Sequence, residues 1–327
     1  RLMRHLGLSG QSVIPLLSSF ACAVPAIMAT RVIPSNRDRI VTILTAPFMT
    51  CSARLPIYAL LIGAFVPQQH LGWLNIQGLV LLSLYLLGIF GGTLTALLLR
   101  KTILSGPKPN FIQAIPEFRI PDLQSVLFKL IDRAKVFLKR AGTIILFVSM
   151  IVWALSYFPR SETIASSLQD NLIEVTDEAA RDALINEAAS DQLAQSWLGR
   201  SGRTLEPLFK PLGWDWRITA AVIAGFPARE VVVAVMGTIY AVGDQADELT
   251  LSNRLQAALD EDGNPIFTLP MVLGLLIFYA WCLQCVATLA IIKRETNSWK
   301  WPLISWIYMT TLGYLGALAA FQIGSAL

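Results

Sequence analysis

The sequence predicts an all-α polytopic membrane protein, and three observations predict it. Of the 327 residues, 54% are hydrophobic and only 15% are charged, whereas soluble globular chains carry roughly 25% charged residues. Two apolar segments carry Pro or Gly near their middle, a pattern typical of the broken helices of transporters. Four segments without Asp, Glu, Lys or Arg are each long enough to cross the bilayer core, which takes roughly 20 apolar residues: 71–99, 141–159, 266–292 and 301–327.

The charges between the apolar segments predict which side of the membrane each loop occupies. Residues 100–140 hold nine Lys or Arg against three acids, and residues 31–39 hold three Arg against one Asp. Both are expected in the cytoplasm, because short cytoplasmic loops carry an excess of basic residues. Residues 160–200 hold eight acids against three Arg, and residues 244–262 hold six acids against one Arg. Both are expected outside.

With these assignments, two apolar segments do not cross the membrane. Residues 13–30 have both ends inside and residues 218–243 have both ends outside, so each is predicted to be a re-entrant hairpin. The first is expected to break near Ala21 to Pro25, and the second at Gly225 and Pro227.

The order of the segments predicts two inverted repeats, each a re-entrant helical hairpin followed by two transmembrane helices. Residues 51–57 (CSARLPI) and 285–291 (CVATLAI) match at four of seven positions, which supports the repeat. A bundle of plain spans with proline kinks is the alternative. The predicted domains are the first repeat (1–100), a cytoplasmic linker (101–140), a reorienting transmembrane helix (141–159), an acidic external segment (160–203) and the second repeat (204–327).

The cytoplasmic linker is predicted to contain an interfacial amphipathic helix. Apolar residues recur at helical spacing from Leu123 to Leu138, opposite Lys129, Arg133 and Lys135. One interpretation is a coupling helix for a cytosolic regulator. The other is a basic helix that rests on anionic membrane lipid.

The cysteines and prolines predict a path for a transition metal. A proline frees the carbonyl four residues earlier, so Pro25, Pro47, Pro56 and Pro227 are expected to release the carbonyls of Ala21, Ile43, Ser52 and Ile223. Two of these carbonyls adjoin cysteines, and sulfur beside backbone oxygen suits a borderline or soft metal ion. The candidate metal ligands are Cys22, Cys51 and Cys285, with Cys282, Met49 and Glu230 as further candidates. The alternative is that the cysteines are small apolar packing residues.

Three ionisable residues lie inside apolar segments and are expected to be buried charges. Arg54 is the only charged residue in a fifth candidate span over residues 40–66, and Arg229 is adjacent to Glu230. Such residues are costly in hydrocarbon and suggest function. Glu230 is a candidate to help a divalent cation through. A structural ion pair between Arg54 and Glu230 is the alternative.

Composition and motifs argue against other classes of function. The net charge of +4 comes from basic residues beside hydrophobic spans, which set orientation, so no nucleic-acid partner is expected. All four cysteines lie in apolar stretches, which disfavours a secreted disulfide framework. The sequence contains no H-E-x-x-H motif and no Ser-His-Asp arrangement, so this chain is not expected to be an enzyme.

Three stretches resemble ferrous iron transport protein B: GLSGQSVIPLLSSFACAVPAIMATR at 7–31, APFMTCSARLPIYALLIGAF at 46–65 and AGFPAREVVVAVMGTIY at 224–240. The resemblance covers nearly the whole chain. It implies the permease core of that family, with two inverted Gate-type halves akin to those of nucleoside transporters. It also implies Fe(II) transport across the bacterial inner membrane into the cytoplasm, along a path lined by Cys22, Cys51 and Cys285.

The family resemblance also implies partners. Members usually carry an N-terminal G domain, here in cis or as a separate chain, and work with a small SH3-like accessory protein. No G-x-x-x-x-G-K-[ST] loop occurs in the sequence, so GTP is expected to act only through a domain not in this chain, and no permanently bound cofactor is expected. A homo-oligomer is left open.

Several alternatives remain open at the level of sequence. A Gate-type transporter of a nucleoside is expected to have several Asn, Gln, Ser and acidic side chains near the breaks, and few are present near the first break. Mn(II) and Zn(II) share ligand types with Fe(II). A non-transporting membrane scaffold would use the cysteines and prolines for packing only. A channel and an alternating-access carrier are not distinguished, nor is the energy source.

Overall fold

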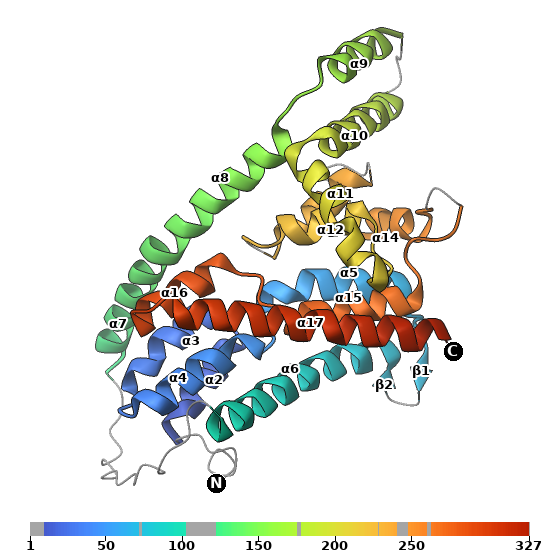
Figure 1. Cartoon of the computed structure of the whole chain (residues 1–327). Helices are drawn as coiled ribbons and strands as arrows, with labels where there is room; N and C mark the ends of the chain where they lie inside the picture. Colours follow the sequence, from blue (N-terminus) through green and yellow to red (C-terminus); the bar gives the residue numbers. More distant parts are fainter. Residues whose placement is uncertain are drawn as a thin grey trace. The chain divides into compact units, whose positions relative to one another are not determined.

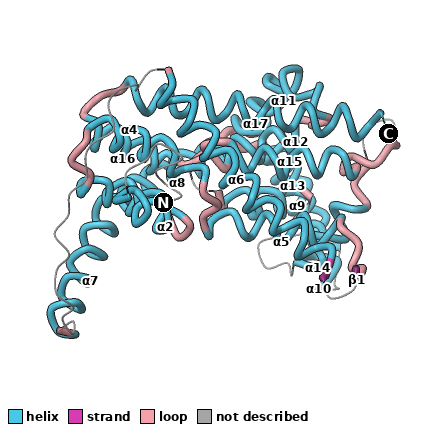
Figure 2. The backbone as a smooth tube through the Cα atoms, turned by 90° about the horizontal axis from the view of Figure 1, so that it is seen from below, coloured by secondary structure: helices cyan, strands magenta, loops and turns pink. Residues whose placement is uncertain are grey.

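The computed structural model describes residues 10–71, 74–102, 122–174, 178–227, 229–240, 248–259 and 263–326. These residues are mostly helical (Figure 2). The named strands are two residues each, β1 (His70–Leu71) and β2 (Leu74–Asn75), and they pair antiparallel with His70 opposite Asn75. The all-α prediction therefore holds apart from this short pair.

The helices vary in length from 7 to 27 residues. In chain order they are α2 (Val13–Ser19), α3 (Ala23–Ala29), α4 (Asn36–Thr45), α5 (Leu55–Phe65), α6 (Ile76–Lys101), α7 (Leu123–Phe137), α8 (Thr143–Tyr157), α9 (Glu162–Glu174), α10 (Glu178–Gln195), α11 (Trp197–Phe209), α12 (Trp216–Ala224), α13 (Val231–Ile239), α14 (Glu248–Gln256), α15 (Leu269–Trp281), α16 (Val286–Thr296) and α17 (Lys300–Ala326). Short 3₁₀ turns are η1 (Gly10–Ser12), η2 (Thr30–Val32), η3 (Ala46–Phe48), η4 (Ser52–Arg54) and η6 (Lys210–Leu212), and η5 (Leu138–Gly142) is a π-helical turn.

Four helical segments of the described residues are long and apolar enough to cross a membrane: Asn36–Phe65, Ile76–Lys101, Leu269–Thr296 and Lys300–Ala326. A fifth is obtained if α8 is joined to residues Glu162–Ile173 of α9, a pair that bends by 74°. These segments coincide with the predicted spans. The chain is a multi-pass membrane protein.

The chain forms two compact units. Unit 1 contains Arg1–Ser52, Gly88–Val148 and Val286–Ser305, and unit 2 contains Ala53–Leu87, Ser149–Cys285 and Trp306–Leu327. The boundaries between them fall inside η4, α6, α8 and α17 and directly before α16.

Within unit 1, α2 and α3 pack against each other, and α3 packs against α16 (Figure 1). Apolar side chains of α3 and α4 fill the core, among them Ile27, Ile43 and Leu44. The helix α4 begins at a cap, since Ser35 Oγ accepts a hydrogen bond from the Asp38 amide.

Within unit 2, α5, α13 and α15 surround a core that contains Tyr58, Phe278 and Tyr279. Trp214 is buried beside them, stacked on Phe209 and edge-on to Phe278. The helices α11 and α12 pack closely because residue 202 is Gly: a Cβ there would lie 2.6 Å from the Trp216 carbonyl oxygen.

The amphipathic helix predicted in the linker is α7. Its apolar side chains are exposed, including Leu123, Leu127 and Leu130. The helix continues through the π-helical turn η5 into α8 without a loop, so the boundary we placed between residues 140 and 141 lies inside continuous helix. Contact of the exposed face with lipid stays a prediction.

Candidate functional site

Cys22 lies at a break between two short helices of unit 1. The helix α2 ends at Ser19, and Cys22 has extended backbone (φ −159°, ψ 135°) as the residue before α3. At seven residues each, α2 and α3 are about 10 Å long, which is too short to cross the hydrocarbon core. The pair is therefore a broken helix, as predicted for this segment.

Cys51 lies at a second break, inside the candidate span Asn36–Phe65. After η3 the chain leaves the helix at residues 49–51 and re-enters it at η4. The sequence predicts helix breaks at Pro47 and Pro56, and the interruption lies between these two prolines. The break packs on α6, where a Cβ on Gly88 would lie 2.8 Å from the Phe48 carbonyl oxygen and one on Gly92 would lie 3.0 Å from Met49 Cε. Two glycines on one face of α6 thus allow the non-helical backbone to approach it.

The two breaks of unit 1 are joined by a hydrogen bond. Ser52 Oγ donates to the Ala21 carbonyl oxygen over 3.2 Å. These residues follow Cys51 and precede Cys22, so both cysteines lie at one junction and each is partly exposed. Met49 is nearly buried, at 8% exposure.

A third break interrupts the candidate span Leu269–Thr296, in unit 2. The helix α15 ends at Trp281, residues 282–285 are not helical, and α16 begins directly after Cys285. Sequence reasoning missed this break because residues 282–285 (CLQC) include neither Pro nor Gly. The match between CSARLPI and CVATLAI was the signal that could have found it, since it aligns Cys285 with Cys51.

The prolines begin helices more often than they break them, which corrects our assignment of freed carbonyls. Pro47 and Pro56 occupy the first turns of η3 and α5, and Pro25 occupies the first turn of α3, where the missing amide would have no helical partner. Two carbonyls expected to be free accept hydrogen bonds: that of Ala21 from Ser52, and that of Ile223 from the Phe226 amide at 3.1 Å.

The second hairpin breaks where the sequence predicted. The helix α12 ends at Ala224, and α13 begins at Val231 after a turn that contains Gly225 and Pro227. A Cβ on Gly225 would lie 2.1 Å from a Val232 methyl carbon. Glycine is therefore required for the close return of the chain.

Arg229, in this turn, fills the third break with its guanidinium. It is 5% exposed and donates from Nη1 to the Tyr279 carbonyl (3.0 Å), from Nη2 to that of Cys282 (2.5 Å) and from Nε to that of Gln284 (3.2 Å). These three carbonyls are not among those that we predicted to be freed, and a protein cation holds them.

The two cysteines of the third break differ in environment. Cys282 is 2% exposed, and its Sγ lies 3.7 Å from Thr310 Oγ1. The guanidinium groups of Arg229 and Arg54 both act electrostatically on its thiol. Cys285 is partly exposed. The two thiols therefore differ in exposure and in the charges that act on them.

The ionisable residues inside apolar segments also differ from one another. Arg54 is 1% exposed. Glu230, which we expected to be buried beside Arg229, is exposed. It is the last residue of the turn before α13.

Sequence reasoning missed a buried carboxylate in unit 1. Glu295 is 2% exposed at its side chain and binds Arg31 at 2.6 Å and Arg39 at 2.8 Å. Nearby, Asp38 binds Arg100 at 2.5 Å. These pairs tie η2, α4, α6 and α16 together, and nothing in the local sequence marks Glu295 as buried.

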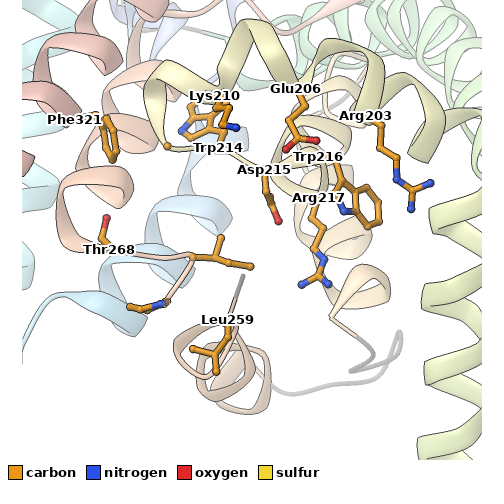
Figure 3. Close-up of a pocket in the computed structure, with 13 residues that line it drawn as sticks. Arg203, Glu206, Lys210, Trp214, Asp215, Trp216, Arg217, Leu259, Thr268 and Phe321 are labelled. Atoms are coloured by element: carbon orange, nitrogen blue, oxygen red, sulfur yellow. The ribbon is translucent and has the colours of Figure 1, made fainter. Parts of the chain in front are cut away.

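A charged cavity of about 830 Å³ lies within unit 2, formed by α11, η6, the start of α12 and the chain before α15. In Figure 3, Trp216 lies beside Arg203 and Arg217, whose Cζ atoms are 4.7 and 5.8 Å from its ring centre. Asp215 caps α12 by accepting from the Ile218 amide. Burial raises the pKa of the Asp215 carboxyl, although that hydrogen bond and Arg217 oppose the shift. This polar cavity was not predicted.

The described part of the structure contains no preassembled set of side-chain ligands for a metal ion. The described part of the chain contains no group of three or more His, Cys, Asp and Glu side chains that could hold a metal ion. Cys22 and Cys51 belong to unit 1, and Cys282 and Cys285 belong to unit 2.

Two family models match the sequence. The Gate model, described as nucleoside recognition, matches residues 1–65 and 138–299, and the model of the ferrous iron transport protein B C terminus matches residues 81–133. Together they cover most of the chain. No solved structure matches.

Curated relatives match nearly the whole chain. An Fe(2+) transporter FeoB of Leptospira interrogans is 41% identical over 99% of this chain and 44% of its own length. That of Methanocaldococcus jannaschii is 37% identical over 100% of this chain and 43% of its own. An Fe(2+) transport protein A/Fe(2+) transporter FeoB fusion protein of Porphyromonas gingivalis is 38% identical over 99% of this chain and 39% of its own length. The chain thus spans less than half the length of these relatives and matches their C-terminal parts.

Proposed function

The chain belongs to the Gate family, and we propose that it forms the permeation part of an Fe(II) transporter that carries the ion across the bacterial inner membrane into the cytoplasm. The observation that carries this proposal is the 37–41% identity, over nearly the whole chain, to proteins named Fe(2+) transporters. That similarity favours Fe(II) as cargo over a nucleoside. Among metal ions, Mn(II) and Zn(II) are the competitors to be tested.

In this proposal Cys22, Cys51 and Cys285 line the path of the ion. Each lies at the end of a non-helical break, and each is partly exposed. A break supplies backbone carbonyls next to a thiol, which together suit Fe(II) better than an all-oxygen site does. The described residues form no cage of three ligands, so we place the thiols at successive positions along the path, where an ion binds weakly enough to leave.

Cys285 is the better candidate in the third break, and Cys282 serves as its natural control. Both belong to the same four-residue break, but Cys282 is buried, contacts Thr310 and is acted on by the positive charges of Arg229 and Arg54. A dication near Cys282 would face the unscreened repulsion of two guanidinium groups.

The proposal includes two partners, an accessory protein and a G domain. The name of the Porphyromonas gingivalis relative joins an Fe(2+) transport protein A to the transporter, which supports a small accessory protein of SH3-like type. An N-terminal G domain, in cis or as a separate chain, would supply any action of GTP. The two inverted Gate-type repeats, supported by the paired breaks at Cys51 and Cys285, belong to the same proposal.

The test is anaerobic uptake of radioactive Fe(II) by proteoliposomes that contain the full chain. Cys22→Ser, Cys51→Ser and Cys285→Ser are compared with the matched variant Cys282→Ser, and each variant must remain monodisperse in detergent. We expect the first three to lower the initial rate by roughly tenfold or more, since even outer-shell changes cost 10–100-fold at metal sites. We expect Cys282→Ser to change it by less than about twofold.

Two results would count against the proposal. Equal rates in all four variants would remove the cysteines from the path. Inhibition of uptake by uridine or adenosine, but not by Mn(II) or Zn(II), would favour a nucleoside carrier instead.

A further inference from the structure

Arg229 is a buried cation whose hydrogen-bond acceptors are backbone carbonyls. At 5% exposure it is surrounded by protein, and its three donor nitrogens all bind backbone carbonyls. Among the described residues, the ion pairs within 4.0 Å are those of Glu295 and Asp38 with other arginines. The adjacent acid Glu230 is exposed.

The three carbonyls form the kind of site that proteins use for cations. Tyr279 lies in the last turn of α15, where carbonyls lack helical partners, and those of Cys282 and Gln284 follow in the break. The C-terminal end of α15 adds a partial negative charge. Converging backbone carbonyls of this sort replace the hydration shell of ions in channel filters. The guanidinium occupies the position that a bound ion would take.

A metal ion and the seated guanidinium exclude each other at these carbonyls. Both need the same oxygen lone pairs, and their charges repel at short range with little solvent to screen them. The break is also tied to the hairpin by Gln284, whose Nε2 donates to the Val222 carbonyl at 3.3 Å. Withdrawal of Arg229 would empty the three carbonyls and remove its own hydrogen bonds to the break, while the Gln284 bond would still hold the break to α12.

We propose that the carbonyls of Tyr279, Cys282 and Gln284 form a cation site that Arg229 fills as a tethered cation, and that a divalent cation enters only when Arg229 withdraws. This rests on the proposed function for the identity of the ion that passes. The site itself is defined by the carbonyls and can be tested by equilibrium binding, without transport.

The experiment removes the tethered cation and asks whether a free one replaces it. Mn(II) binding to the purified full chain in detergent is measured by electron paramagnetic resonance for the unmodified protein, Arg229→Ala and Arg229→Gln. Arg203→Ala is the control, because Arg203 is an exposed arginine of the same unit. Guanidinium chloride at low millimolar concentration is added as a competitor that mimics the missing side chain.

We expect Arg229→Ala to bind one additional Mn(II) at the emptied carbonyls. The dissociation constant of this site should be at least about tenfold lower than in the unmodified protein, which corresponds to 1.4 kcal/mol. Guanidinium should displace this ion from Arg229→Ala and should raise the midpoint of its thermal unfolding. Arg203→Ala should bind Mn(II) as the unmodified chain does. If Arg229→Ala does not fold, Arg229→Gln carries the same test, because its amide can still donate to a carbonyl while carrying no charge.

A merely structural role for Arg229 predicts a different outcome. The variants would then unfold more easily but gain no Mn(II) site, or would gain one that guanidinium does not displace, and either result overturns the proposal. Failure of the cysteine variants to alter Fe(II) uptake would leave this binding result unchanged, so the two proposals can fail separately.

Discussion

The break at residues 49–51 in unit 1 and the break at residues 282–285 in unit 2 make an instructive pair. Each interrupts a candidate span, and each ends at a cysteine that a helical turn follows at once. Each also packs on a glycine of a long helix: the first on Gly88 of α6, and the second on Gly313 of α17, where a Cβ would lie 3.1 Å from the Cys282 amide nitrogen.

The two breaks differ in what satisfies their backbone. The first is joined to its neighbouring break by a neutral hydroxyl, that of Ser52. The second is held by the buried guanidinium of Arg229. Unit 1 also has buried charge, but there carboxylates accept from the arginines. Two similar backbone breaks thus differ in electrostatics. The first is held by a neutral hydroxyl, and the carbonyls of the second are occupied by a protein cation.

The largest effect on this comparison is expected at the carboxylate of unit 1. Glu295→Gln removes the buried negative charge that faces Arg31 and Arg39, and it leaves the half-exposed Arg31 and the partly buried Arg39 with a weaker acceptor. We expect the free energy of unfolding to fall by about 2–4 kcal/mol, measured by denaturant titration in detergent. The exposed Glu162→Gln is the control. A change as small as the control's would show that unit 1 does not depend on paired charge.

A smaller effect is expected where the breaks meet the glycines. Gly88→Ala places a methyl group 2.8 Å from a backbone oxygen, and Gly313→Ala meets its nearest atoms at 3.1 Å and beyond. We expect a loss of about 1–3 kcal/mol for Gly88→Ala and less for Gly313→Ala, by the same titration. Gly78→Ala, in α6 with nothing within 4 Å of the added Cβ, should be neutral or gain up to about 1 kcal/mol. Equal losses at positions 78 and 88 would contradict close packing of the first break.

The smallest effect is expected for the hydroxyl that joins the two breaks of unit 1. Ser52→Ala removes the hydrogen bond to the Ala21 carbonyl, and we expect a loss of about 0.5–1.5 kcal/mol. Ser52→Thr keeps a hydroxyl and should lose less. The measurement is the thermal unfolding midpoint, together with the alkylation rate of Cys51, which should rise as the junction loosens. An unchanged midpoint and rate would mean that the hydroxyl does not hold the junction.

The spans could be predicted because their physical requirement is local. An apolar run of sufficient length crosses the bilayer wherever it lies in the chain, and the predicted segments coincide with α6, α17 and the other candidate spans. The breaks near Ala21 and at Gly225 could also be predicted, because proline and glycine mark them. The break at residues 282–285 was missed, since its residues alone favour continued helix, and the Arg229 donors that bind its carbonyls come from a distant part of the sequence.

Hydrophobic length, charge distribution and motif are properties of short segments, so the sequence predicts a multi-pass membrane protein of the Gate type with cysteines near interrupted helices. The folded chain was needed to show which carbonyls have donors, that Arg229 and not Glu230 is the buried charge of its pair, and that Glu295 is a buried carboxylate. Those outcomes depend on residues that are distant in sequence, such as Arg229 and Tyr279 or Arg31 and Glu295. No local pattern records which donor will reach which acceptor.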